Sequence, residues 1–244
     1  MPRVTHEEGS FDRQTDRLVF LLRERVLQGE FTAGERLTEL GLVPLLGASR
    51  TPVRLALERL SHDGLLDALP SGGFRVRSFT LAEVLDAVEI RGVLEGTAAR
   101  FAAERLESAA ELAHLKSLVE QTAIETPITA ETFARYLEKN DRFHAEIWRL
   151  AKSAALMRAL ETICKLPFAA PGSLVFTDAD RDPSIRFIAM EHHRAISEAI
   201  EQRAGARAEA LAREHSRISR RNLEWALQQD EAARRVPGAS LITM

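Results

Sequence analysis

The residues best suited to metal chemistry lie in the second half of the sequence. Asn140 and His144 are four residues apart and share one face of a predicted helix, and Asp141 lies three residues before the histidine. His193 follows 49 residues after His144, and His215 follows 22 residues later. On three helices of one bundle, these imidazole and oxygen groups would suit Zn²⁺, Ni²⁺ or a similar divalent ion. Composition alone favours the alternative of surface histidines, since seven among 244 residues is an ordinary number.

A second group of residues suits nucleic-acid recognition. Arg50 and Arg54 lie one turn apart on a predicted helix whose apolar positions point inward, so both guanidinium groups can project into a DNA major groove. Ser49 and Thr51 add short hydrogen-bond donors beside the helix N-terminus, where a phosphate binds well. The alternative is that both arginines are solvated side chains of a surface helix.

The elements around these arginines predict a winged helix-turn-helix domain. Apolar spacing and caps indicate helices at about 15–28, 38–46 and 49–63. Two short strand-like runs, 65–69 and 74–77, then flank a Pro-Ser-Gly-Gly turn. Three helices followed by a two-stranded wing are the expected order for this motif.

The rest of the chain predicts a second, all-helical domain, so the protein is mainly α. Thr80 and Glu83 have the form of a capping box, which places the domain boundary at 77–79. Breaks near 125–128, 166–172, 179–184 and 204–206 divide the domain into six or seven helices. We expect an N-terminal extension (1–14), a winged helix-turn-helix domain (15–77), a helical domain (80–229) and a frayed C-terminal tail (230–244).

Composition excludes several classes of protein. The formal charge of −3 argues against a protein that coats nucleic acid indiscriminately, although all basic residues of the first 77 positions are arginines. A single cysteine, Cys164, cannot form an internal disulfide, so a metal must use nitrogen and oxygen ligands. We expect no membrane span, because no apolar run approaches the roughly 18 residues required. The polar N-terminus predicts a cytoplasmic protein.

Residues 15–77 resemble the winged helix domain of the GntR family of bacterial transcription regulators. The matching motifs are Gly34-Glu35-Arg36-Leu37, Ser49-Arg50-Thr51-Pro52-Val53-Arg54, Ala56-Leu57, Arg59-Leu60 and Asp63-Gly64-Leu65. The resemblance implies a set of residues that bind double-stranded operator DNA: Arg36, Ser49, Arg50, Thr51, Arg54 and, at the wing tip, Gly73. One departure is Gly72, where many relatives carry Arg, which weakens the case for wing contacts relative to the third helix.

Residues 80–228 resemble the FCD effector and dimerisation domain of the FadR-type branch of this family. The matching motifs are Glu89-Ile90-Arg91, Leu94-Glu95, Ala98-Ala99-Arg100, Asn140 to His144, His193 to Ile196, and His215. Many members hold a divalent metal with an Asp or Asn and three His, which implies the ligands Asn140, His144, His193 and His215. Asn stands where Asp is commoner, which predicts weaker metal binding. Asp141 is the alternative oxygen ligand, and His192 is expected to point away from the site.

The same resemblance implies that Arg91 pairs with the carboxylate of a small organic acid. The alternative is an ion pair with Glu95, one turn along the same helix. The apolar segment 166–176 between two helices is similar to that of vanillate-responsive repressors, which makes an aromatic acid the first candidate for the effector.

Three functional hypotheses follow. The first is a ligand-responsive transcription regulator, a repressor that binds an inverted-repeat operator as a homodimer. The second is a regulator that senses the metal itself. The third is a helical metalloenzyme, prompted by the Glu111-x-x-His114 sequence. A di-iron bundle requires a second such motif, which this sequence lacks, so we interpret Glu111 and His114 as a solvated pair.

Overall fold

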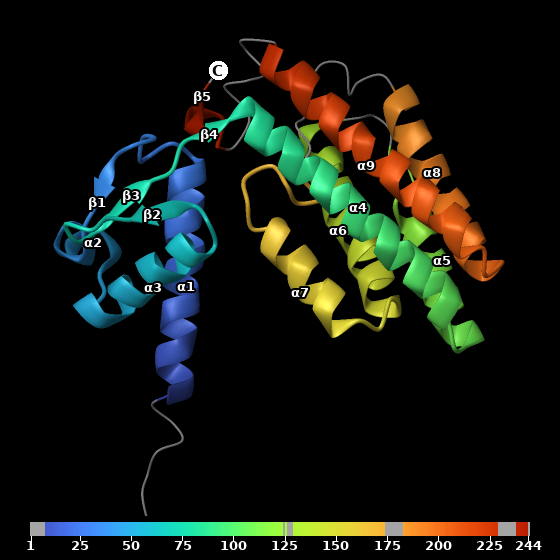
Figure 1. Cartoon of the computed structure of the whole chain (residues 1–244), viewed down its shortest axis with the longest axis horizontal. Helices are drawn as coiled ribbons and strands as arrows, with labels where there is room; N and C mark the ends of the chain where they lie inside the picture. The colour runs from blue at the N-terminus through green and yellow to red at the C-terminus, as the bar shows by residue number, and fades with distance from the viewer. Residues whose placement is uncertain (1–7, 124, 126–128, 174–182, 229–237, 244) are drawn as a thin grey trace, which may run out of the picture. The chain divides into compact units, whose positions relative to one another are not determined.

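The computed structural model describes residues 8–123, 125, 129–173, 183–228 and 238–243. The chain divides into two compact units (Figure 1). The winged-helix unit comprises Met1–Leu81 together with Pro237–Met244, and the helical unit comprises Ala82–Val236. None of the described helices is long and apolar enough to cross a membrane.

Three helices form the body of the winged-helix unit: α1 (Glu8–Leu27), α2 (Glu39–Leu46) and α3 (Arg50–His62). Their apolar faces meet in a core that excludes water from Leu22, Val26, Leu57 and Leu60. Helix α1 begins earlier than the predicted Thr15, because its first turns are polar and carry no apolar stripe that the sequence pattern could detect.

Local signals define α2 and the turn that follows it. The hydroxyl of Thr38 accepts a hydrogen bond from the backbone N–H of Gly41 at 3.2 Å and so caps the helix N-terminus. Gly47 adopts φ +59°, the left-handed conformation that ends a helix and that glycine adopts without steric strain. These two residues begin and end α2 at the positions that the sequence predicts.

The wing is a three-stranded antiparallel sheet in the order β1-β3-β2. The predicted hairpin is formed by β2 (Leu66–Ala68) and β3 (Phe74–Val76). Strand β1 (Arg36–Leu37) was missed, because two residues are too few for an alternating pattern and their partner lies on β3, far along the chain.

The end of the chain returns to the winged-helix unit. A short 3₁₀ helix at Ala239–Leu241 precedes β5 (Ile242–Thr243), which pairs in parallel with β4 (Phe79–Thr80). Leu241 is completely buried. The expectation of a frayed tail was therefore wrong for residues 238–243, whose buried leucine and backbone pairing hold them in place.

Six helices are described in the helical unit, the first of which begins at the boundary between the units (Figure 1). They are α4 (Leu81–Arg105), α5 (Ala109–Gln121), α6 (Ala130–Leu150), α7 (Ala154–Ile163), α8 (Pro183–Glu201) and α9 (Gly205–Gln228). The sequence did not predict the turns at 106–108 and 151–153, where Ser108 and Ser153 cap the next helix through their side chains.

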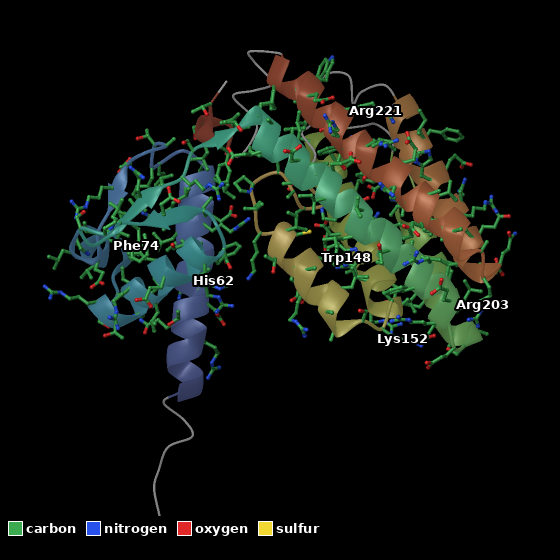
Figure 2. The ribbon with its side chains drawn as sticks, viewed as in Figure 1. His62, Phe74, Trp148, Lys152, Arg203 and Arg221 are labelled. Carbon is green, nitrogen blue, oxygen red and sulfur yellow. The ribbon has the colours of Figure 1, made fainter. Side chains whose placement is uncertain are left out.

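The core of the helical unit forms where α5 packs on α6 and α8, and α8 packs on α9. Phe143, Leu115, Leu150 and Ile200 are completely buried there. Ion pairs form between polar side chains at the surface turns. Lys152, at the turn between α6 and α7, lies 3.0 Å from a carboxylate oxygen of Glu107 (Figure 2).

Candidate DNA-binding surface and metal centre

Helix α3 separates a buried face from a charged, exposed one. Its buried residues pack into the winged-helix core: Pro52, Val53, Ala56, Leu57 and Leu60. Arg50, Thr51 and Arg54 are exposed on the other side of the helix. Among the described residues, Arg54 forms an ion pair only with Glu58, at 3.9 Å, and both side chains are about half exposed. The arginines therefore remain able to contact DNA bases and phosphates.

Ser49 occupies the N-cap position of α3 but does not cap it through its side chain. Its backbone is extended, with φ −75° and ψ 165°, and its hydroxyl makes no capping hydrogen bond. Because the residue is exposed, the hydroxyl and the first backbone N–H groups of α3 can face an anion together. This is the arrangement that phosphate contacts by Ser49 and Thr51 require.

Arg36 lies beside the wing tip and holds it. Its Nη2 donates to the backbone carbonyl of Gly72 at 2.7 Å and lies 3.4 Å from that of Ser71. Gly73 adopts φ +81°, and a Cβ atom there would lie only 3.0 Å from the carbonyl oxygen of Leu37. The structure thus gives Arg36 a positioning role at the wing in addition to its predicted place at the DNA surface.

In the helical unit, three of the predicted metal ligands converge. The imidazole nitrogens of His144 on α6, His193 on α8 and His215 on α9 lie within 4.8 Å of one another. All three side chains are at least nine-tenths buried. The alternative of surface histidines is therefore wrong for these three residues, which one-dimensional spacing alone could not decide.

A hydrogen bond fixes which nitrogen of His193 is free. The hydroxyl of Thr122, at the end of α5, donates its single hydrogen to the carbonyl of Val119 at 2.7 Å. The same oxygen lies 3.2 Å from Nδ1 of His193 and therefore accepts from it. Nδ1 then carries the proton, and the lone pair of Nε2 points toward His215.

The distance between Nε2 of His193 and Nε2 of His215 fits the binding of one metal ion by both nitrogens. Nε2 of His193 and Nε2 of His215 are 3.1 Å apart. Two nitrogen ligands at 2.0–2.1 Å from one metal are separated by about 3.0–3.4 Å. Burial lowers the pKa of both histidines well below the usual value, and the neighbouring histidines lower it further, so both rings are neutral at pH 7. Neutral imidazole is the form that binds metals.

The structure places the two candidate oxygen ligands in different surroundings. Asn140 is buried, with only 2% of its surface exposed, one turn before His144 on the same face of α6. Asp141 is exposed on that helix and accepts a hydrogen bond from the backbone N–H of Gly172. Burial therefore favours Asn140 as the oxygen ligand.

Arg91 and Glu95 form a charged pair beside the histidines, with side chains 1% and 4% exposed. Arg91 Nε lies 3.7 Å from one Glu95 oxygen, and the other oxygen lies 2.7 Å from Nδ1 of His144. The predicted ion pair is thus present, but Glu95 also orients His144, as a carboxylate does behind a metal-binding histidine. Nε, Nη1 and Nη2 of Arg91 have no hydrogen-bond partner among the described residues.

Arg91 and His144 keep the carboxylate of Glu95 ionised. Burial alone would raise its pKa, but the charges of His144 and Arg91 and the hydrogen bond to His144 hold the pKa at about 2. In contrast, burial raises the pKa of the nearby Cys164 thiol to about 12. Cys164 is therefore a neutral thiol at pH 7, and the site offers nitrogen and oxygen donors, as the sequence predicts.

Two residues that contact the histidine cluster were not predicted from the sequence. Thr122 orients His193, and the ring centre of Phe143 lies 4.1 Å from that of His193. No sequence signal links Thr122 to a histidine 71 positions away.

The structure describes two other predicted features, His192 and part of the segment 166–176. His192 is outside the three-histidine group, although its ring centre lies 5.8 Å from that of His215. In the apolar segment 166–176, Phe168 and Ala169 are buried, and 174–176 lie outside the described residues.

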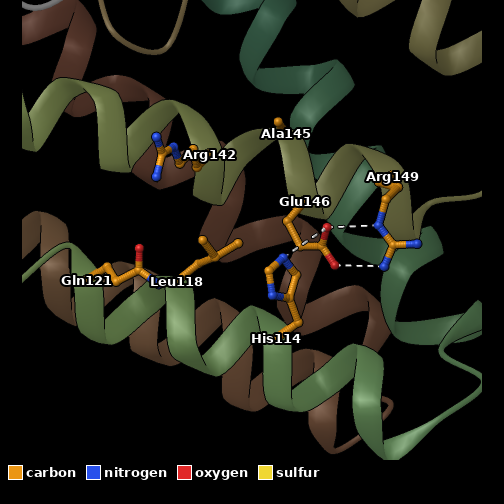
Figure 3. A pocket seen from close by; sticks show the side chains of 7 residues that line it. All are labelled: His114, Leu118, Gln121, Arg142, Ala145, Glu146 and Arg149. Atoms are coloured by element: carbon orange, nitrogen blue, oxygen red, sulfur yellow. Dashed lines mark hydrogen bonds and ion pairs between the residues drawn. The ribbon is translucent and has the colours of Figure 1, made fainter.

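A separate groove of about 420 Å³ lies between α5 and α6 (Figure 3). It contains His114, whose Nε2 is 4.0 Å from a carboxylate oxygen of Glu146. Arg149 donates two hydrogen bonds to Glu146, at 2.7 and 2.8 Å, and so neutralises the buried carboxylate. Glu111 instead contacts Lys152 at 3.1 Å. Glu111 and His114 thus belong to surface ion-pair networks.

These two sites define a class of protein, in which a winged helix that can read DNA is joined to a helical unit with a buried polar site. Residues 14–76 match the family of bacterial regulatory proteins named gntR, and residues 86–217 match the FCD domain. The chain belongs to the gntR family and carries an FCD domain. The two predicted resemblances and the fold class are confirmed.

Curated relatives agree with this assignment. The chain is 32% identical over 149 residues to a probable D-xylose utilization operon transcriptional repressor of Paenarthrobacter nicotinovorans, covering 57% of this chain and 60% of the relative. It is 31% identical over 133 residues to the Nta operon transcriptional regulator of Aminobacter aminovorans, covering 54% and 61%. The chain thus spans about three fifths of these relatives. Both relatives are named as transcriptional regulators, which favours regulation over the metalloenzyme hypothesis.

The fold is shared with solved structures of low sequence identity. McbR/YncC of E. coli has a TM-score of 0.60 at 21% identity, covering 88% of this chain and 98% of that one. The Lar regulator of Listeria monocytogenes has a TM-score of 0.55 at 19% identity, covering 85% and 96%. At these identities the similarity concerns the fold alone.

Proposed function

We propose that the protein is a ligand-responsive transcription repressor that binds an inverted-repeat operator as a homodimer and responds to a small carboxylic acid. Helix α3 enters the major groove, where Arg50 and Arg54 contact base edges and Ser49 and Thr51 contact phosphates. One short recognition helix contacts only a few base pairs, so two copies related by a two-fold axis are needed to specify an operator.

The observation that carries the proposal is the guanidinium group of Arg91. It is 99% buried, pairs with the Glu95 carboxylate that also contacts His144, and makes no hydrogen bond within the described part of the chain. A buried cation without hydrogen bonds is costly for a folded protein, and a ligand carboxylate would supply two parallel ones. The pairing with Glu95 at 3.7 Å leaves this forked geometry free.

The same site fits a divalent ion, Zn²⁺ or Ni²⁺, held by Asn140, His144, His193 and His215. When bound, the ion supplies a Lewis-acidic centre that attracts an anionic effector. Glu95 and Thr122 orient two of the histidines, and Arg91 holds the effector carboxylate. Phe143, whose ring centre lies 4.1 Å from that of His193, favours an aromatic acid, with vanillate as the first compound to test.

Dimerisation would use apolar surface of the helical unit. Ile90 and Val93 lie one turn apart on α4 and are 51% and 39% exposed, so they offer apolar surface to a second copy. Binding of the acid would favour a dimer geometry in which the two recognition helices no longer match the half-site spacing. We expect Ile90→Glu to convert a dimer to a monomer in size-exclusion chromatography with light scattering; an unchanged mass would contradict this interface.

Thermal unfolding against a panel of aliphatic and aromatic acids tests the effector site directly. An acid that binds the native state raises the melting temperature. We expect at least one acid to do so in the wild type and none in Arg91→Met, which keeps the side-chain volume and removes the guanidinium group. Arg207→Ala, a surface arginine, is the control. A hit that Arg91→Met retains would overturn the assignment of Arg91.

The histidine cluster supports a second candidate function, a regulator for which the metal itself is the signal. Operator binding separates the two functions, using an operator selected from random DNA. A metal sensor changes its affinity between Zn²⁺ and chelator without any acid, whereas an acid-responsive repressor with a structural metal needs the acid for the change. An operator without inverted symmetry would contradict the homodimer proposal.

A further inference from the structure

A row of three charged side chains crosses the sheet of the wing. Arg75 lies on the middle strand, β3, directly opposite Arg36 of β1 on one side and Asp67 of β2 on the other. All three residues are exposed, whereas Phe74 and Val76, on either side of Arg75, are buried. The row therefore lies on the face of the sheet that points away from the winged-helix core. We call Arg36, Arg75 and Asp67 the wing row.

The wing row places two positive charges next to each other. Side chains directly opposite in an antiparallel pair have Cβ atoms about 4.5–5.5 Å apart, and like charges at this distance destabilise the sheet. Arg36 is held in place, because its Nη2 donates to the carbonyl of Gly72 at 2.7 Å. An anion between the two guanidinium groups would offset their repulsion and accept hydrogen bonds from Arg75.

The ion pair of Arg75 is weak. Within the described part of the chain its guanidinium group makes no hydrogen bond, and its one ion pair joins Nη2 to Oδ2 of Asp67 at 3.9 Å. The two side chains are 51% and 49% exposed, and a pair so accessible to water contributes little to stability. The donors of Arg75 thus remain available to an external anion that can displace Asp67.

We propose that Arg75 binds a phosphate of the DNA backbone and that Asp67 competes with this phosphate for the guanidinium group. Arg36 is a predicted DNA contact, and Arg75 is its cross-strand neighbour on the same face, so both reach the same stretch of backbone. A phosphate contact carries no sequence information, so Asp67 lowers affinity for operator and random DNA alike. That the wing approaches DNA rests on the proposed function; the pairing within the wing row does not.

The first experiment measures the affinity of Arg75→Ala for a selected operator and for a random duplex of equal length, by fluorescence anisotropy over a series of salt concentrations. Both affinities should fall about three- to tenfold, and the slope of log affinity against log salt should decrease by about 0.9, as for one lost phosphate contact. Arg59→Ala is the control, because Arg59 is an exposed arginine of the same unit that pairs with Asp16 at 2.8 Å. Unchanged affinity, or a loss confined to the operator, would overturn the phosphate contact.

The second experiment removes the competitor. Asp67→Asn should strengthen binding to both duplexes about two- to threefold, since the pair that it breaks is weak. Asp16→Asn removes the same charge from the same unit and should leave both affinities nearly unchanged. In the Arg75→Ala background, Asp67→Asn should have no effect. Weaker binding by Asp67→Asn, or an equal gain in Asp16→Asn, would contradict the competition.

Folding of the variants is checked by thermal unfolding, and we expect unchanged melting temperatures because both side chains are half exposed. Arg75→Gln is the second variant if Arg75→Ala does not fold. Arg75→Lys keeps the charge and should recover most of the lost affinity, because a lysine also binds phosphate. No recovery in a folded Arg75→Lys would contradict a phosphate contact.

The double variant Arg50→Ala and Arg54→Ala distinguishes failure of the wing contact from failure of the proposed function. It should abolish the preference for operator over random DNA, whereas Arg75→Ala should leave that preference unchanged. If only the double variant weakens binding, the DNA surface of α3 stands and the wing contact is refuted. A wild-type protein that binds neither duplex would overturn both.

Discussion

The two units hold their functional polar residues in opposite ways. Helix α3 keeps Arg50 and Arg54 in water, on a helix whose other face supplies the hydrophobic core. The helical unit buries Arg91, Glu95 and three histidines in its interior. One unit presents its charged residues to water, whereas the other packs them against one another.

This difference has an energetic consequence. Exposed arginines contribute little to folding, so evolution can change the DNA contacts without loss of stability. Buried charges and imidazoles require hydrogen-bond or ion-pair partners to offset the loss of water. Glu95 provides one for His144, and Thr122 provides one for His193. We therefore expect stability and function to be separable in the winged-helix unit and coupled in the helical unit.

The largest effect is expected at Phe143, which is completely buried and packs against His193. Phe143→Ala should lower the free energy of unfolding of the helical unit by about 3–5 kcal/mol, because it leaves a cavity in the core. Tryptophan fluorescence in urea measures this. Phe187→Ala, at a residue 53% exposed on α8, is the control. Equal stability of the two variants would contradict the assigned core.

The next effect tests separability in the winged-helix unit. The double variant Arg50→Ala and Arg54→Ala should weaken operator binding about 100-fold or more, since each forked contact with a base contributes about 1–3 kcal/mol. The melting temperature should not change, because both side chains are exposed. Fluorescence anisotropy measures the affinity, with Arg207→Ala as the control. Unfolding of the double variant would show that these arginines are structural.

Acid should destabilise the helical unit selectively. The pKa values of His193 and His215 are lowered by burial in the folded state, so below pH 6.5 the unfolded chain binds protons that the native state does not. Well below pH 6.5 the free energy of unfolding should therefore fall by about 1.4 kcal/mol per pH unit for each histidine; between pH 6.5 and 5.5, where the unfolded histidines are still titrating, the two together should cost about 2 kcal/mol.

Tryptophan fluorescence in urea, with chelator present, follows this acid effect. Glu95 should add a further loss at lower pH, between about 4.5 and its folded pKa of about 2. A stability that does not vary between pH 7 and 5.5 would contradict the neutral, buried state of the two histidines.

The smallest effect concerns Arg36, which is exposed and yet holds the wing. Arg36→Ala removes the hydrogen bond to Gly72, which contributes about 1 kcal/mol, so operator affinity should fall about five- to tenfold. Faster amide exchange at 69–73 should accompany the loss if Arg36 positions the wing. Weaker binding without any change in exchange would instead indicate a direct DNA contact.

The sequence predicted best where local rules decide the structure. Thr38 and Gly47 set the ends of α2 through a cap and a left-handed turn, and the apolar spacing of α3 placed Arg50 and Arg54 outward. It failed where a partner lies far along the chain. Neither β1 nor β5 has a recognisable pattern, because two residues form a strand only when a distant segment pairs with them.

The sequence by itself determined the winged helix, the helical nature of the second unit and the identity of the candidate ligands, since periodicity, caps and residue types are local properties. Only the tertiary structure decided that His144, His193 and His215 share one site, that Glu95 and Thr122 orient two of them, and that Arg91 is left without a hydrogen bond. These facts depend on side chains from four helices and the end of α5 meeting in space. Burial, which sets both the pKa values and the need for partners, exists only once the chain has packed.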